Sequence, residues 1–131
     1  MNKDLAVAFA QLATARQAGM SVEASLRVVA DAHVSSALWD ALVAARDAAA
    51  ADEQLSLAAA LGARQAAPRF PNLCQRALDA VRTPEAEVQT LRSLRDSYRL
   101  SYELDVQRRQ LIALGGIAAA VVAATLIRRR R

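Results

Sequence analysis

The chain has 131 residues, of which 54% are hydrophobic and 4% aromatic, so we expect one domain with an Ala, Leu and Val core plus an appendage. Its formal charge of +4 comes from Arg128 to Arg131, because the remaining 13 Lys and Arg balance 13 Asp and Glu; this argues against nucleic-acid binding, which needs a basic stripe across the fold. The single cysteine, Cys74, excludes an intramolecular disulfide and a cysteine metal site and is expected in the core.

Helical patterns follow one another along the first half of the chain. Apolar residues at helical spacing predict a first helix that contains Leu5, Phe9 and Leu12 and ends at Gly19, which can take a left-handed cap conformation. Ser21 is the expected N-cap of a second helix. A third helix is expected to begin at Ser35 or Ser36 and to carry Leu38, Trp39, Leu42 and Val43, and a short fourth one spans about 56–64.

The second half contains the clearest helix boundaries. Prolines at positions 68 and 71 predict a corner, after which Asn72 is expected to cap a fifth helix that runs to about Val81. Thr83 at the N-cap and Pro84 at the first helical position then predict the start of a long sixth helix. No strand pattern is present, so the expected fold class is all-α, a six-helix bundle.

The segment Leu111 to Ile127 holds 17 uncharged and mostly apolar residues. At about 1.5 Å per residue it measures about 25 Å, near the short limit for crossing a hydrocarbon core of about 30 Å. Flanking arginines can extend it by snorkelling; they are Arg108, Arg109, Arg128, Arg129, Arg130 and Arg131. We therefore expect a helical domain at 1–110, a transmembrane helix at 111–127 and a basic tail at 128–131. The alternative is a last core helix of a soluble bundle.

Two features bear on how such a segment would sit and associate. Gly115 and Gly116 provide the small surface that close helix packing in a membrane needs.

The N-terminus lacks the continuous apolar stretch of a signal peptide, since Gln11, Arg16 and Gln17 interrupt it. We expect a cytoplasmic domain, although arginines on both sides of the segment leave the positive-inside rule almost balanced.

No residues form a catalytic constellation, so the sequence predicts neither an enzyme nor a cofactor site. His33, the single histidine, lies on an apolar helical face and is expected to be structural, because a general base needs a positioned partner. Asp47, Asp52 and Glu53 lack the spacing of a calcium loop and are better explained as a solvated loop than as a cation site. Trp39 is expected in the core, with partner binding as the alternative.

Charged residues alternate along the sixth helix before the apolar segment. Arg92, Arg95 and Arg99 are candidates for docking a cytoplasmic partner, and plain solvation is the alternative. Tyr98 and Tyr102 are candidates for an aromatic belt at the membrane interface, at a distance of several turns from Leu111.

Several short motifs in the correct order resemble the F domain of type II secretion systems. The resemblance rests on Phe9, Leu12-Ala13-Thr14, Ala18-Gly19-Met20-Ser21-Val22, Ala24-Ser25-Leu26, Ser56-Leu57-Ala58-Ala59-Ala60-Leu61 and Phe70-Pro71-Asn72-Leu73. It covers about 5–127 and implies a six-helix bundle of the kind found, usually twice, in inner-membrane platform proteins of type II secretion and type IV pilus machines. The chain departs from the family at Gln54, where members carry glycine, and at 81–86, where they carry a G-E-x-x-G-x-L turn.

The resemblance implies a structural component of a filament-assembly machine in the bacterial inner membrane, single-pass and with one F domain. The implied partners are membrane lipids, the assembly ATPase or pilin-like proteins, and further copies of the chain. Two other functions remain open: a soluble helical adaptor with no role in secretion, and a small membrane-active protein whose span and arginine tail are the functional part.

Overall fold

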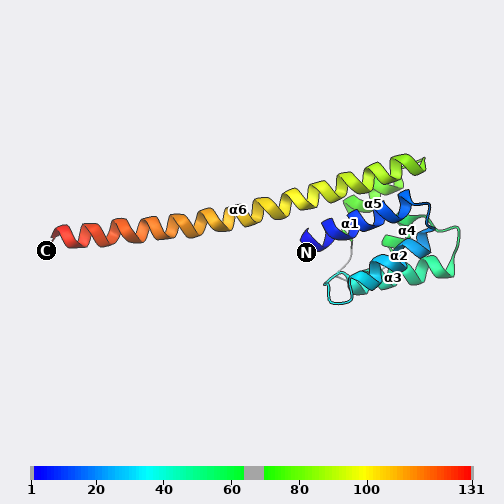
Figure 1. The fold of residues 1–131 in the computed structure, drawn as a ribbon, viewed down its shortest axis with the longest axis horizontal. Helices are drawn as coiled ribbons and strands as arrows, with labels where there is room; N and C mark the ends of the chain where they lie inside the picture. The colour runs from blue at the N-terminus through cyan, green and yellow to red at the C-terminus, as the bar shows by residue number, and fades with distance from the viewer. Residues whose placement is uncertain (1, 64–69, 131) are drawn as a thin grey trace. The chain divides into compact units, whose positions relative to one another are not determined.

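A computed structural model describes residues 2–63 and 70–130, with side chains up to residue 116. Most of the described residues are helical, and they contain no strand. The six helices, labelled in Figure 1, are α1 (Asn2–Gln17), α2 (Val22–Ala32), α3 (Trp39–Ala51), α4 (Leu57–Leu61), α5 (Asn72–Asp79) and α6 (Pro84–Arg130). The predicted all-α fold with six helices is therefore confirmed.

Three predicted helix boundaries are confirmed in atomic detail. Gly19 has a φ of 84°, and the amide of Met20 donates to the carbonyl of Ala15, which is the 6→1 bond of a Schellman motif. The hydroxyl of Ser21 accepts from the amide of Ala24 at 3.1 Å, and that of Thr83 accepts from the amide of Ala86 at 3.2 Å. Local sequence thus sets these helix ends.

Two predicted caps are wrong. At the start of α3 the cap is Leu38, which makes no side-chain cap bond, while Ser36 accepts from the amide of Leu38 inside a turn. At the start of α5 the cap is Pro71, and Asn72 is already helical. At α3 the cap residue Leu38 is itself deeply buried, and at α5 the buried residue is Phe70, next to the cap. In both cases the helix starts at a different residue from the one that local preference favours.

The core of the bundle centres on Phe9 of α1. The centroid of its ring lies 5.9 Å from the ring centroid of Phe70 and 5.9 Å from that of Tyr98. The rings of Phe9 and Tyr98 are stacked, with an angle of 19° between their planes. The other buried members come from every helix and include Leu12, Leu26, Leu42, Leu61, Cys74, Leu78 and Leu91. The core position predicted for Cys74 is confirmed, whereas that for Trp39 is wrong, because Trp39 is 39% exposed.

The chain divides into two compact units, Met1–Arg99 and Leu100–Arg131. The first contains α1 to α5 and the beginning of α6, and the second is the rest of α6. The boundary predicted after residue 110 falls within the second unit and stays a prediction. In the described part of the chain, no helix has both the length and the apolar character needed to cross a membrane. Of the predicted membrane segment, the side chains from residue 117 onward lie outside the description.

Candidate docking surface

The three arginines predicted to dock a partner lie on α6 within the first unit, and each differs in surroundings. Arg92 is exposed, and its guanidinium donates to the side-chain carbonyl of Gln17 on α1. Arg95 donates from Nε to Asp96 at 2.8 Å. Arg99 is exposed. The structure therefore places Arg92 at the junction of α1 and α6 and leaves the other two on the outer surface of α6.

Arg92 also lines a groove between the end of α1 and the start of α6. The groove has a volume of about 340 Å³ and is lined by Arg16, Gln17, Pro84, Glu85, Val88, Gln89 and Arg92. Its wall combines an apolar floor with amide, carboxylate and guanidinium groups.

An ion pair beside this groove connects the two helices. Arg16 pairs with Glu87, and only 21% and 17% of their side chains are exposed. Arg16 also donates to the carbonyl of Met20 at 2.7 Å, which connects the pair to the end of α1. The amino-acid sequence alone gives no sign of this contact, because no local pattern relates two residues that are 71 positions apart.

The charges on the outer surface of α6 affect one another. The Arg95 hydrogen bond holds the pKa of Asp96 below its ordinary value, with the charges of Arg95 and Arg99 acting in the same direction. The same hydrogen bond raises the pKa of Arg95. Asp96 is therefore a carboxylate near neutral pH, and a partner that binds Arg95 must compete with it.

Tyr98 does not contribute to a membrane belt. Its hydroxyl lies 3.2 Å from Sγ of Cys74, and its ring packs against the core. Burial raises the pKa of the tyrosine and also that of the Cys74 thiol. Of the two candidates for an aromatic belt, Tyr98 is therefore part of the packed bundle, while Tyr102 is 39% exposed and its role stays a prediction.

The predicted membrane-flanking and membrane residues belong to the second unit. Arg108, Arg109, Leu111, Gly115 and Gly116 are exposed there. A Cβ added to either glycine would meet nothing within 4 Å. Ile127 and the arginines from 128 to 131 have no described side chains. Both glycines thus have room for larger side chains.

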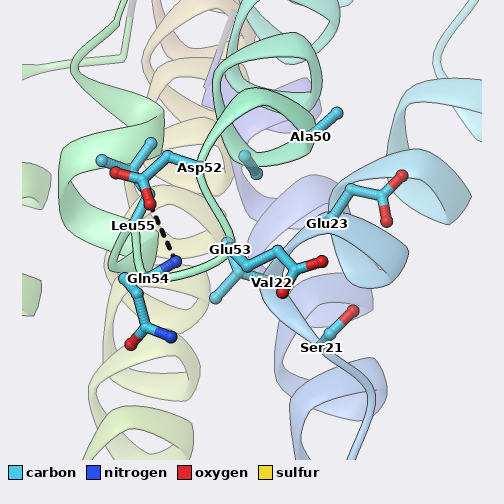
Figure 2. A pocket seen from close by; sticks show the side chains of 9 residues that line it. Ser21, Val22, Glu23, Ala50, Asp52, Glu53, Gln54 and Leu55 are labelled. Atoms are coloured by element: carbon cyan, nitrogen blue, oxygen red, sulfur yellow. Dashed lines mark hydrogen bonds between the residues drawn. The ribbon is translucent and has the colours of Figure 1, made fainter.

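An acidic pocket lies elsewhere in the bundle, between the start of α2 and the connection from α3 to α4 (Figure 2). It has a volume of about 420 Å³, and Glu23, Asp52 and Glu53 are among its lining residues. Glu23 pairs with Arg27 on its own helix, and Asp52 accepts from the amide of Gln54 at 2.9 Å (Figure 2). Among the described residues, no three His, Cys, Asp or Glu are placed to hold a metal ion.

His33 has the surroundings of a structural histidine. It is 5% exposed, and its Nε2 lies 2.8 Å from the side-chain carbonyl of Gln11. Burial lowers its pKa, against an opposing effect of Asp4. His33 is thus a neutral side chain that joins α1 to the end of α2.

Comparison with known proteins gives one family. The family model described as "Type II secretion system (T2SS), protein F" matches residues 8–127. Neither a search of curated proteins nor one of solved structures gave a match. Members of the matched family are structural components of secretion machinery rather than known enzymes, and they are typically associated with the inner membrane. With a match over nearly its whole length, on a bundle of six helices, this chain belongs to the family of type II secretion system protein F.

Proposed function

We propose that this protein is a membrane-anchored structural component of a type II secretion or type IV pilus-like assembly machine. The observation that carries the proposal is the extent of the family match, residues 8–127. That range includes the helical bundle and also the predicted membrane segment, Leu111 to Ile127. The bundle would be cytoplasmic and the anchor a single pass through the bacterial inner membrane.

The proposed role is mechanical. The bundle would dock an assembly ATPase or a similar cytoplasmic partner through Arg92 and the α1–α6 groove, with Arg95 and Arg99 on the adjoining surface of α6. Two arginines support this assignment by their surroundings. Arg92 borders the groove of about 340 Å³ between α1 and α6. Arg95 contacts the exposed carboxylate of Asp96, which a carboxylate of the partner can replace. Partner carboxylates would therefore exchange with Gln17 and Asp96.

Charge reversal tests this docking surface. We expect Arg92→Glu with Arg95→Glu to reduce copurification of the assembly ATPase at least tenfold, since each attraction becomes a repulsion. Arg27→Glu is the matched control, because Arg27 is also an exposed arginine paired with a nearby carboxylate but lies on α2. Equal loss with the control variant would show that the α6 arginines have no special part.

Carbonate extraction tests the anchor. The full chain should stay in the membrane pellet, and Val121→Glu with Val122→Glu should release it, because a charge near the bilayer centre costs about 3 kcal/mol. Val28→Glu with Val34→Glu is the control, since these valines are exposed in the first unit. Release of the unaltered chain would overturn the anchor and favour the soluble adaptor.

The anchor is also proposed to contact lipids through Arg108, Arg109 and the tail at 128–131, and to contact pilin-like proteins or other copies of the chain. Gly115 and Gly116 would form the close-packed surface. Gly115→Leu with Gly116→Leu should weaken self-association in a membrane reporter assay, with Ala123→Leu and Ala124→Leu as controls of similar size. Unchanged association would remove the glycines from the contact.

A further inference from the structure

The second unit carries a row of exposed leucines at regular spacing. Leu100, Leu104, Leu111 and Leu114 are 56%, 54%, 69% and 62% exposed. With Gln107 they follow steps of four, three, four and three residues, which is the spacing of the a and d positions of a heptad repeat. Their side chains therefore form one apolar stripe along the helix, about 22 Å long at 1.5 Å per residue.

This stripe is not a continuation of the row of α6 residues that joins the bundle core. Val88, Leu91 and Tyr98 belong to that row, and Leu100 follows Tyr98 by two positions. Residues two apart on a helix do not share a face. The leucine stripe thus lies on a different face of the helix from the core residues. Its burial requires a partner of its own.

Charged residues beside the stripe indicate which partner fits. With Leu104 and Leu111 at a positions, Glu103 takes the preceding g position and Arg108 takes the e position that follows Gln107. In a parallel two-stranded coiled coil, a g residue faces the e residue five positions later on the other helix. Glu103 of each copy would therefore face Arg108 of the other, so the edge is self-complementary.

We propose that residues 100–114 pair with the same segment of a second copy as a parallel coiled coil. Leu104 and Leu111 pack at a, Leu100 and Leu114 pack at d, and Gln107 meets its counterpart at d, where the amides can bond to each other. Leu100, Leu104 and Gln107 precede the proposed membrane segment, and Leu111 and Leu114 lie at its start, so the pairing would continue into that segment. It does not depend on the docking of an ATPase. The surface that contacts the second copy is thus the leucine stripe, which belongs to the second unit and not to the helical bundle of the first.

Cysteine cross-linking in the full chain tests the pairing. Gln107→Cys places a thiol at the seam without removing a leucine, and we expect a disulfide-linked dimer after mild oxidation of the detergent-solubilised protein. Asp105→Cys is the matched control, since its b position faces away from a partner, and it should not form a disulfide-linked dimer. Cys74 of the parent chain is buried and should not cross-link. Equal cross-linking at 105 and 107 would overturn the proposal.

Charge exchange gives an independent readout by sedimentation. Arg108→Glu and Glu103→Arg should each weaken dimerisation about tenfold, because two attractive pairs become repulsive, and the double exchange should restore it. Arg109→Glu is the control at the outward f position and should have little effect. A monomeric parent chain, or equal effects at 108 and 109, would overturn the pairing. Carbonate extraction reports the anchor separately, so that a pellet-bound chain without cross-links rejects the pairing alone.

Discussion

Leu91 and Leu104 belong to the same helix and have the same side chain, yet one is fully buried and the other is 54% exposed. In the first unit, α6 has neighbours: Leu91 joins the core, Tyr98 stacks on Phe9, and Glu87 pairs with Arg16. In the second unit most of the described side chains from Leu104 onward are exposed. The helix itself follows from local preference, whereas burial depends on what packs against it.

The largest effect expected within this contrast comes from Phe9. Phe9→Ala should lower the free energy of unfolding of the bundle by about 4 kcal/mol, because it leaves a cavity between Phe70 and Tyr98. The loss can be measured by urea unfolding with Trp39 fluorescence, since the single tryptophan lies in the first unit. A loss below about 1 kcal/mol would mean that Phe9 does not connect α6 to the core.

A matched pair of leucine substitutions tests the contrast directly. Leu91→Ala should lower the free energy of unfolding by about 3 kcal/mol, whereas Leu104→Ala should change it by less than about 0.5 kcal/mol, as for an exposed site. Trp39 fluorescence again reports the bundle. Similar losses for the two variants would show that Leu104 is packed against the bundle in solution.

The N-cap of α6 should have a smaller effect. Thr83→Ala removes the oxygen that accepts from the amide of Ala86 and should cost about 1 kcal/mol of bundle stability. Thr83→Ser keeps that oxygen and serves as the control. If both variants unfold at the same urea concentration, the cap contributes little to holding α6 in the first unit.

The smallest expected effect is a pH dependence that arises from His33. Its folded pKa lies below the ordinary value of 6.5, so the unfolded chain takes up a proton at higher pH than the folded chain does. Stability should therefore be fully present above pH 6.5 and be lost as the pH falls through the folded pKa. His33→Gln, unfolded in urea at several pH values between 7.5 and 5.5, should show a flatter dependence. An unchanged slope would assign the effect to other groups.

The candidate site was only partly predictable. Arg92, Arg95 and Arg99 were identified from charge alone, but the role of Arg92 at a groove depends on Gln17 and Pro84, which are far from each other in sequence. The Arg16–Glu87 pair left no sequence signal at all. Tyr98 is a candidate for a membrane interface from sequence because it lies one turn from Tyr102 before the apolar segment, and only the packed bundle places it between Phe9 and Cys74.

Local sequence determined the class of fold, the order of the helices and the ends set by Gly19, Ser21 and Thr83, because these depend on hydrogen bonds within a few residues. Short motifs in order also determined the family. The tertiary structure alone decided that Leu38 rather than Trp39 is buried, that Phe9 joins Phe70 to Tyr98, and that Leu91 is buried whereas Leu104 is exposed. Those outcomes depend on contacts between distant residues, and helical periodicity specifies a face without specifying what covers it.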